Sequence, residues 1–404
     1  MTSPDQVPDV NTGEREGSDM DDCRAFPDGL PLMRPRVPTA EELSPFLTEM
    51  AESGYMSNFG PICQRYEATL AEQLDVRHCL ALANLSSGLM FMPHAAGLDG
   101  GEVILPSYTF VATAHSMRMA GLTPVFADVD PLTFCLEPES VEAAIGPDTV
   151  AICGVHIYGT PCDVEALQRI ADKHSLVLFY DSAHGIGSHV GGRPLGGFGL
   201  AEGFSTSVTK IFTTMGEGGF ITTNDDRFAE QIRAAREWGR FSGDNAEFPS
   251  IVSKLSEVCA AAGLIELPRL SEYVAHRRML VDLAREIFRD TLGIRLPVVA
   301  EGNGSGHKDL AVMIDPDRFG IDRDSLATRL KEQGIETRAY FSPAVHQMEA
   351  YHDLNHRVSL TNTELAASQA LCLPIFNAMT ADQMSRLCET ILTIRQQHVT
   401  TIKS

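Results

Sequence analysis

The feature that most constrains the fold is the regular alternation of short apolar runs with longer amphipathic stretches. Seven apolar runs lie at 79–83, 102–105, 124–127, 150–154, 176–180, 202–206 and 219–223. Stretches with the length of crossover helices lie between them, at 86–98, 110–121, 137–145 and 163–174. Such alternation is typical of a mainly parallel sheet covered on both faces. We therefore predict an α/β fold with a mainly parallel, seven-stranded sheet.

The flanking sequence predicts two domains and a tail. Residues 40–75 read as two amphipathic helices around a loop at 54–61. After residue 225 the pattern is mostly helical, with one strand at 309–314 and helices at 225–239, 253–266, 269–292, 322–333 and 380–397. We predict a large domain over 27–270, with the helical segment at its start, and a smaller α/β domain over 271–404. Residues 1–22 hold seven acids and one arginine, so 1–26 is predicted to be a disordered acidic tail without a signal peptide.

The charge excludes two broad classes of partner. The chain has 32 basic and 54 acidic residues, a formal net charge of −22. A general nucleic-acid binder or a peripheral protein of anionic membranes needs a basic face. No stretch reaches the roughly 18 apolar residues of a membrane helix. The nine cysteines form no C-x-x-C pair, which favours buried thiols in a reducing cytoplasm over disulfides or a metal site.

Two strand ends carry residues with chemical potential. The run LVLFYDSAHGIG places Asp181 at the end of a buried strand, where open α/β sheets bind ligands. A carboxylate there is costly unless a cation pairs with it, although Asp181 is equally a candidate cap for the next turn. In FSTSVTKIFTTMGEGG, Lys210 stands among hydroxyls and glycines after another strand. It is a candidate Schiff-base amine, with an exposed loop lysine as the alternative.

Two further strand ends add polar and aromatic groups. Ser86 and Ser87 open a helix in NLSSGL, which suits an anion site or a simple N-cap. In VILPSYTFVATA, Tyr108 and Phe110 offer a ring to stack on a ligand, or side chains for the core. An amine, a carboxylate, a hydroxyl-rich helix start and a ring are the groups that a pyridoxal phosphate (PLP) site requires.

The order and spacing of six motifs resemble one family. NLSSGL (84–89), VILPSYTFVATA (103–114), PVFADVDP (124–131), YDSAHGIG (180–187), FSTSVTK (204–210) and EGGFITTND (217–225) are similar to the DegT/DnrJ/StrS nucleotide-sugar aminotransferases. The resemblance covers about 27–395 and implies the PLP-dependent transferase fold of type I. It is greatest to enzymes that aminate C4 of a dTDP-4-keto-6-deoxy-D-glucose, through SGYMSNFGP (53–61) and YFSPAVH (340–346).

The resemblance implies a role for each matching residue. Lys210 would bind the PLP aldehyde, Asp181 would pair with the pyridine nitrogen, and His184 would contact the 3-oxygen. The cofactor phosphate would lie on Ser86, Ser87 and Ser205, and the cofactor ring against Phe110. The sugar site would include Tyr55, Ser57, Asn58, Arg338, Tyr340 and His346.

The resemblance also implies an activity and partners. The expected reaction moves an amino group from glutamate to the keto carbon of a dTDP-keto-6-deoxy-hexose, in deoxyaminosugar biosynthesis for a glycosylated secondary metabolite. The expected assembly is a homodimer with the active site at the subunit interface. One departure is Glu237, which stands where many relatives have an Asn that reaches the partner's cofactor phosphate; another is Val252, in place of a second Asn.

Three other functions remain open at this point. A 3-keto nucleotide-sugar aminotransferase would use the same cofactor residues. A non-enzymatic regulator built on the PLP fold would bind the cofactor without transferring an amine. A dinucleotide oxidoreductase would need a G-x-G-x-x-G motif after an early strand, which this sequence lacks.

Overall fold

The computed structural model of the chain describes residues 24–354 and 357–403, and the side chains up to residue 398. Its centre is a seven-stranded sheet with the order β1-β9-β8-β5-β4-β2-β3. β9 is antiparallel to both of its neighbours, and the remaining pairs are parallel. The predicted strands are confirmed to within two residues at each end. They are β1 (His78–Leu82), β2 (Glu102–Pro106), β3 (Thr123–Ala127), β4 (Thr149–Val155), β5 (Val177–Asp181), β8 (Ala201–Ser205) and β9 (Gly219–Thr223).

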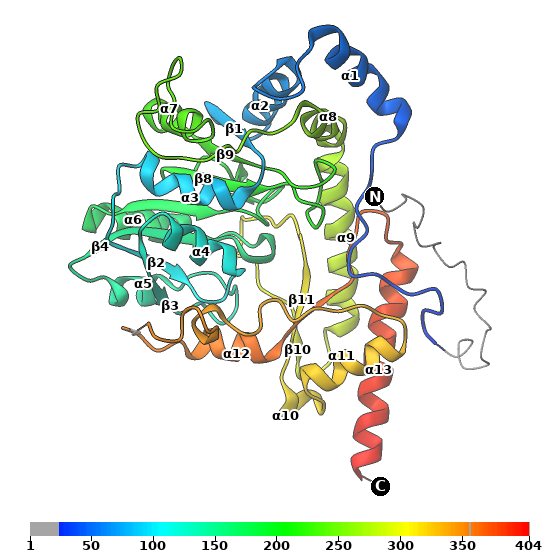
Figure 1. The fold of residues 1–404 in the computed structure, drawn as a ribbon. Helices are drawn as coiled ribbons and strands as arrows, with labels where there is room; N and C mark the ends of the chain where they lie inside the picture. The colour runs from blue at the N-terminus through cyan, green and yellow to red at the C-terminus, as the bar shows by residue number, and fades with distance from the viewer. Residues whose placement is uncertain (1–23, 355–356, 404) are drawn as a thin grey trace, which may run out of the picture.

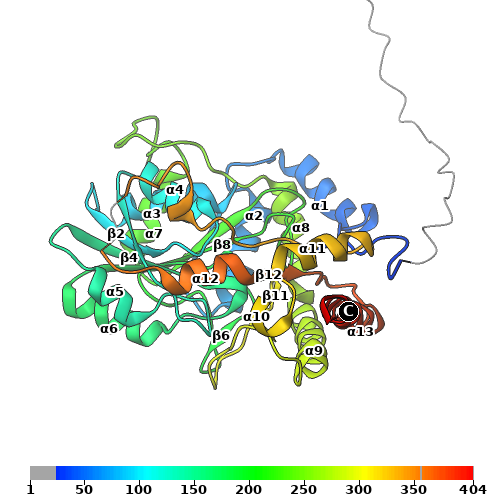
Figure 2. The same ribbon diagram turned by 90° about the horizontal axis from the view of Figure 1, so that it is seen from below.

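Helices cover both faces of this sheet (Figure 2). Ile104, Ile152 and Leu178 pack on one face, and their chain neighbours pack on the other, because successive strand residues point to opposite sides. Both sets are apolar, which explains the continuous apolar runs in the sequence. One face is covered by α3 (Leu85–Ala95), α4 (Val111–Met119) and α7 (Asp226–Ala235), and the other by α5 (Pro138–Ala144) and α6 (Val164–His174).

The N-terminal helices lie at the β1 end of the sheet (Figure 1). α1 (Ala40–Ser53) begins at Thr39, whose side chain forms a capping box with Glu42, and ends at Gly54 in the left-handed conformation. α2 (Pro61–Gln73) packs with α8 (Glu257–Glu266) in a core that also takes apolar residues from β1 and β9. These elements fix the 54–60 loop against the start of α8, where the Glu257 N–H donates to the Met56 carbonyl at 2.9 Å.

The C-terminal part has its own apolar core. The long α9 (Leu270–Phe288) and α13 (Ala381–Lys403) run side by side in both views. With them is a three-stranded antiparallel sheet, β10-β11-β12, of which only β11 was predicted. The strands and shorter helices of this part are β10 (Ile294–Arg295), β11 (Leu310–Ile314), β12 (Ala370–Leu373), α10 (Pro316–Phe319), α11 (Arg323–Glu332) and α12 (Thr361–Gln369). A separate two-stranded hairpin, β6 (His189–Val190) and β7 (Arg193–Pro194), lies between β5 and β8 in the chain.

Two segments pack with a different core from the one that the predicted domain division gives them. Val345, Tyr351 and Leu360 pack into a core of the large sheet, although they fall within the predicted small domain. Conversely, Phe26 is 8% exposed and packs into the C-terminal core, and its N–H donates to the Gln333 carbonyl at 3.0 Å. The predicted tail therefore ends before residue 26, and most of it lies outside the described residues. The boundary at residue 270 stays a prediction.

The cysteines and helices bear on two sequence-based expectations. The eight described cysteines are free thiols, and all but Cys259 are buried. None of the helices in the described part of the chain has the length and apolar character needed to cross a membrane. Residues 1–23, which include Cys23 and most of the predicted acidic tail, lie outside the described residues.

Candidate active site

Seven of the predicted residues line one cavity of ≈ 320 Å³ at the carboxyl edge of the large sheet. β5 and β8 are parallel, so Asp181 and Ser205 end at the same edge. β1 runs in the same direction as β8, because β9 is antiparallel to both. The carboxyl end of β1 leads into the start of α3. Topology thus brings together motifs that are far apart in the sequence. The seven residues are Ser86, Phe110, Asp181, His184, Ser205, Lys210 and Tyr340.

The Lys210 amine is the candidate nucleophile of this cavity. Its residue lies on the loop between β8 and β9, where its backbone N–H donates to the Ser207 carbonyl at 3.0 Å. Burial, and then the positive charge of Lys308, lower the pKa of Lys210 to about 7, against the opposing effect of Asp309 and Asp181. A substantial fraction of the amine is therefore neutral near pH 7 and able to attack a carbonyl carbon.

Asp181 is a buried carboxylate, 5% exposed, with two hydrogen bonds. The Thr113 hydroxyl donates to Oδ2 at 2.7 Å and the Ala183 N–H donates to Oδ1 at 3.0 Å. The second bond is the turn cap considered as the alternative, so Asp181 caps the turn and lines the cavity at once. Burial raises the pKa of Asp181, and these two bonds and the charge of Lys210 oppose that rise. A cation in the cavity would complete its pairing.

His184 is neutral in this environment. Burial and the charges of Lys210 and Lys308 hold the pKa of His184 well below its usual range. The Tyr158 N–H donates to Nδ1 at 3.2 Å, so Nδ1 is unprotonated and Nε2 carries the proton of the neutral ring. The ring lies nearly parallel to that of Phe341, with 6.2 Å between centroids. His184 can therefore offer one N–H donor to a ligand.

Hydroxyl groups and the N-terminus of α3 form the polar end of the cavity. Ser86 is exposed in the first turn of α3, and the Ser205 and Ser207 hydroxyls are 3.4 Å apart. At Gly219 a Cβ would lie 2.7 Å from the Phe204 carbonyl oxygen and 2.8 Å from the Leu85 nitrogen, so a glycine is needed for β9 to pass beside the helix start. A helix N-terminus with hydroxyls suits a phosphate group.

Ser87 does not belong to this polar end. It is 7% exposed and does not line the cavity. Its hydroxyl donates to the Asn84 carbonyl at 2.9 Å and lies 2.5 Å from the Ser253 hydroxyl. The structure therefore does not bring the Ser87 side chain to the cavity, because helical geometry turns it toward the core while Ser86 faces the cavity.

The predicted sugar residues before α2 lie outside the cavity of this chain. Tyr55, Ser57 and Asn58 are on the α1–α2 loop, with Tyr55 49% exposed. Asn58 Oδ1 accepts a hydrogen bond from the Lys254 ammonium. Within one subunit, the structure does not bring these three residues to Lys210.

The predicted sugar residues from the C-terminal part divide into two groups. Tyr340 lines the cavity, and its carbonyl accepts hydrogen bonds from the Tyr108 and Tyr158 hydroxyls. Arg338 does not line it; its side chain is 55% exposed and pairs with Glu336 at 2.9 Å. His346 is buried away from the cavity, with Nδ1 2.7 Å from the Ser107 hydroxyl, so it fastens its loop to the end of β2 instead.

Glu237, the departure from the family pattern, is neutralised locally. Its carboxylate lies 3.2 Å from the Arg240 guanidinium and 3.5 Å from the Lys254 ammonium. Arg236, the other basic neighbour, is turned inward to Glu67 and to the Ala81 carbonyl. Glu237 also forms a β-bridge with Val252, the second departure. The acid at 237 is thus part of a basic cluster.

Several residues of the site were given no role from the sequence, although three of them lie inside the quoted motifs. Glu217 and Phe341 line the cavity, and Thr113 supports Asp181 from α4. The most consequential is Lys308, which is 7% exposed and reaches the cavity from the segment before β11. Its only sequence signal is that the chain has just six lysines, one of which directly precedes a buried strand.

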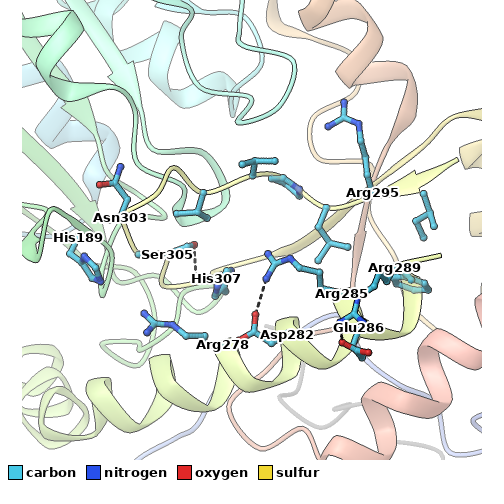
Figure 3. A pocket seen from close by; sticks show the side chains of 18 residues that line it. His189, Arg278, Asp282, Arg285, Glu286, Arg289, Arg295, Asn303, Ser305 and His307 are labelled. Carbon is cyan, nitrogen blue, oxygen red and sulfur yellow. Dashed lines mark hydrogen bonds and ion pairs between the residues drawn. The ribbon is translucent and has the colours of Figure 1, made fainter. Parts of the chain in front are cut away.

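A larger hollow of ≈ 1010 Å³ lies elsewhere, between α9 and the 294–307 segment (Figure 3). Basic side chains project into it, and Arg285 is paired with Asp282 at 2.7 Å. It contains none of the residues predicted for the site. In the part of the chain that the structure describes, no group of three His, Cys, Asp or Glu side chains is placed to hold a metal ion.

The cavity of Lys210 fits PLP. The amine whose pKa is lowered, the buried carboxylate and the hydroxyl-rich helix start are the three groups that the aldehyde, the pyridine nitrogen and the phosphate need. Phe110, which is 59% exposed, lies at the entrance with its ring 6.2 Å from that of Phe341. The start of α3, from Asn84 to Ser86, lines the same cavity, and a helix N-terminus suits a phosphate group.

Comparison with known proteins agrees with this geometry. The model of the DegT/DnrJ/EryC1/StrS aminotransferase family matches residues 39–392. The chain is 33% identical to dTDP-4-amino-4,6-dideoxy-D-glucose transaminase of Shigella dysenteriae, over 90% of this chain and 98% of the relative. It is also 33% identical to a pleiotropic regulatory protein of Geobacillus stearothermophilus, over 87% of this chain and 95% of the relative.

A solved structure gives the same result for the fold. The chain superposes on DesI, determined in the presence of its TDP-sugar product, with a TM-score of 0.88 and 38% identity, over 94% of this chain and 96% of DesI. The predicted fold class, a type I PLP-dependent transferase, is confirmed by this match.

Proposed function

This chain belongs to the DegT/DnrJ/EryC1/StrS aminotransferase family, and from that membership we propose that it transfers an amino group from glutamate to C4 of a dTDP-4-keto-6-deoxy-hexose. The family is PLP-dependent, and so is this enzyme. The relative from Shigella dysenteriae and DesI support a dTDP-linked sugar as the acceptor. The observation that carries the proposal is the Lys210 amine facing Asp181 across one cavity of ≈ 320 Å³.

The residues of the chain have distinct tasks in this reaction. PLP, when bound, supplies an electron sink that stabilises negative charge on the carbon next to the nitrogen. Lys210 would hold the cofactor, and its amine would move a proton to and from the reacting carbon. A pKa of about 7 suits this task, since the amine can accept and return the proton near neutral pH.

Asp181 and His184 set the electronic state of the cofactor. The Asp181 carboxylate, held by Thr113 and Ala183, keeps the pyridine nitrogen protonated by charge pairing. The Nε2–H of neutral His184 can donate to the 3-oxygen without adding charge. Ser86, Ser205 and the N-terminus of α3 bind the phosphate.

The same proposal covers the assembly and setting of the enzyme. We infer a homodimer whose partner supplies the remaining sugar contacts, because Tyr55, Ser57, Asn58 and Arg338 lie outside the cavity of their own subunit. Trp238 and Val252 are 43% and 50% exposed beside the Glu237 cluster, which suits a subunit contact. A cytoplasmic location accords with the free, buried thiols of the described residues. We propose deoxyaminosugar biosynthesis for a secondary metabolite as the pathway.

A panel of acceptors tests the proposal. The PLP-loaded enzyme is incubated with L-glutamate and either dTDP-4-keto or dTDP-3-keto hexoses, and the aminated carbon is identified by NMR. Amination at C4 is the expected result. Amination only at C3 would refute the C4 assignment and establish the 3-keto alternative.

The regulator alternative is favoured by one observation, the 33% identity to the pleiotropic regulatory protein. It predicts PLP binding without conversion of the cofactor to its amine form by any amino acid. Membership of the aminotransferase family and the 33% identity to the transaminase of Shigella dysenteriae favour the enzyme. The oxidoreductase alternative loses its support with the family assignment.

A further inference from the structure

Lys308 is the cation of the cavity that has no task in holding the cofactor. The charged residues of the lining are Asp181, Lys210, Glu217 and Lys308, with His184 neutral. The proposed function assigns Asp181 and Lys210 to PLP, and Glu217 is an acid. Within the described ranges, Lys308 alone is left to bind an anionic part of a substrate in this subunit's cavity.

The backbone and the side chain of Lys308 are both fixed. Its N–H donates to the Tyr158 carbonyl at 3.1 Å, and its own carbonyl accepts from Arg277 at 3.1 Å. The ammonium donates to Asp309 Oδ1 at 2.7 Å and lies 5.5 Å from the centre of the Tyr340 ring. An ammonium has three N–H donors, so two remain for a ligand after the bond to Asp309.

The position of Lys308 in the cavity determines which anionic group of a substrate it can bind. Lys308 lines the same cavity of ≈ 320 Å³ as Lys210 and His184, and its positive charge lowers the pKa of both. An anion bound by Lys308 is therefore close to the carbon that reacts with the cofactor. In a nucleotide-linked hexose the diphosphate is on C1, with the sugar ring between it and C4. In an α-amino acid the carboxylate is on the reacting carbon itself.

From this placement we propose that Lys308 binds the α-carboxylate of the amino donor and so selects an α-amino acid in the first half of the reaction. The proposal rests on the proposed aminotransferase function and adds a specificity residue to it. A keto sugar has no carboxylate, so Lys308 acts differently on the two half-reactions. Asp309 is a positioning residue that holds the ammonium in place.

The test compares Lys308→Met with the wild-type enzyme in separate half-reactions. Conversion of PLP to its amine form by L-glutamate, and the reverse conversion by the keto sugar, are followed by absorbance in single turnovers. We expect the apparent Kd for glutamate to rise about 10- to 100-fold, the effect of losing one charge-assisted hydrogen bond. The half-reaction with the keto sugar should change much less.

Two further measurements separate binding from a general structural role. The wild type should prefer glutamate to 4-aminobutyrate, which has no carboxylate on its reacting carbon, and Lys308→Met should reduce that preference about 10-fold or more. Lys308→Arg should recover part of it. Titration of the PLP absorbance with maleate, an unreactive dicarboxylate, should show weaker binding to Lys308→Met. Lys173→Met, on the surface lysine paired with Glu142, is the matched control.

The outcomes are distinguishable. Equal losses in both half-reactions, or an unchanged preference between the two donors, would overturn the role of Lys308 while the proposed function stands. If no amino acid converts PLP to its amine form in the wild-type enzyme, the proposed function is refuted. The maleate titration would still test the role of Lys308 in that case.

Discussion

The hydrogen bond from Thr113 to Asp181 gives the sharpest test of the site. Thr113→Val keeps the shape of the side chain and removes the hydroxyl that donates to Asp181 Oδ2 at 2.7 Å. A hydrogen bond to a charged group contributes about 1.5–3 kcal/mol. The Ala183 N–H still binds Oδ1 in the variant, so we take the lower end, about 1.5 kcal/mol.

This loss has two measurable consequences. First, kcat/KM for the half-reaction with glutamate should fall about tenfold, since 1.4 kcal/mol corresponds to a factor of ten. Second, the Thr113 hydrogen bond opposes the rise in the pKa of Asp181 that burial causes, so its removal should raise that pKa further. Asp181 acts as a carboxylate, and activity is lost as pH falls through its pKa. The acid limb of the pH profile should therefore move to higher pH.

The assay is the pH dependence of single-turnover conversion of PLP by glutamate. Thr109→Val is the control, because the Thr109 hydroxyl contacts Thr113 at 2.9 Å but has no bond to Asp181. It should have a smaller effect in the same direction. If Thr113→Val leaves the acid limb in place and kcat/KM within about twofold of wild type, or if Thr109→Val is equally harmful, the assignment of Asp181 as the charge partner is refuted.

Three further predictions concern the same cavity. Borohydride reduction of the PLP-loaded enzyme should attach the cofactor to the peptide of Lys210, and an adduct on Lys308, the other lysine of the lining, would contradict the assignment. In the cofactor-free protein, acylation of Lys210 should rise with pH through about 7, because the amine reacts when neutral, and Lys308→Met should move this midpoint to higher pH; a midpoint near 10.5, the ordinary value, would contradict it. Gly219→Ala should weaken PLP binding and lower the melting temperature, because its Cβ would meet Phe204 and Leu85 at 2.7–2.8 Å; unchanged values would show that β9 can move freely.

The large sheet could be predicted from the sequence because its signal is local. A parallel strand buried on both faces is a continuous apolar run, and each run here ends at a turn residue. β12 and α12 were missed for the opposite reason. β12 has only four residues, Ala370–Leu373, and α12 has apolar residues without a clear helical period, so their identity depends on the cores they contact.

The site could be predicted as far as it follows strand ends. Asp181, Ser205 and Lys210 belong to motifs that end or follow a strand, so the topology of the sheet was enough to bring them together. Lys308 comes from the segment before β11, and only the packing of the C-terminal part on the sheet shows that it reaches the site. Thr113 lies on α4 within the 103–114 motif, and only the structure shows that its hydroxyl bonds to Asp181. His346 belongs to a motif of the sequence but does not line the cavity, because its ring is hydrogen-bonded to Ser107.

The two tyrosine hydroxyls on the Tyr340 carbonyl fasten one wall of the cavity to the other. Lys308, Tyr340 and Phe341 come from the C-terminal part, and the remaining lining residues come from the large sheet and its helices. A ligand in the cavity therefore touches both parts, and its binding free energy adds to their cohesion. By mass action, a ligand at 100 times its Kd adds about 2.7 kcal/mol to the folded state. The resistance of this enzyme to heat and proteolysis should accordingly follow the supply of vitamin B6 in the cell that makes it.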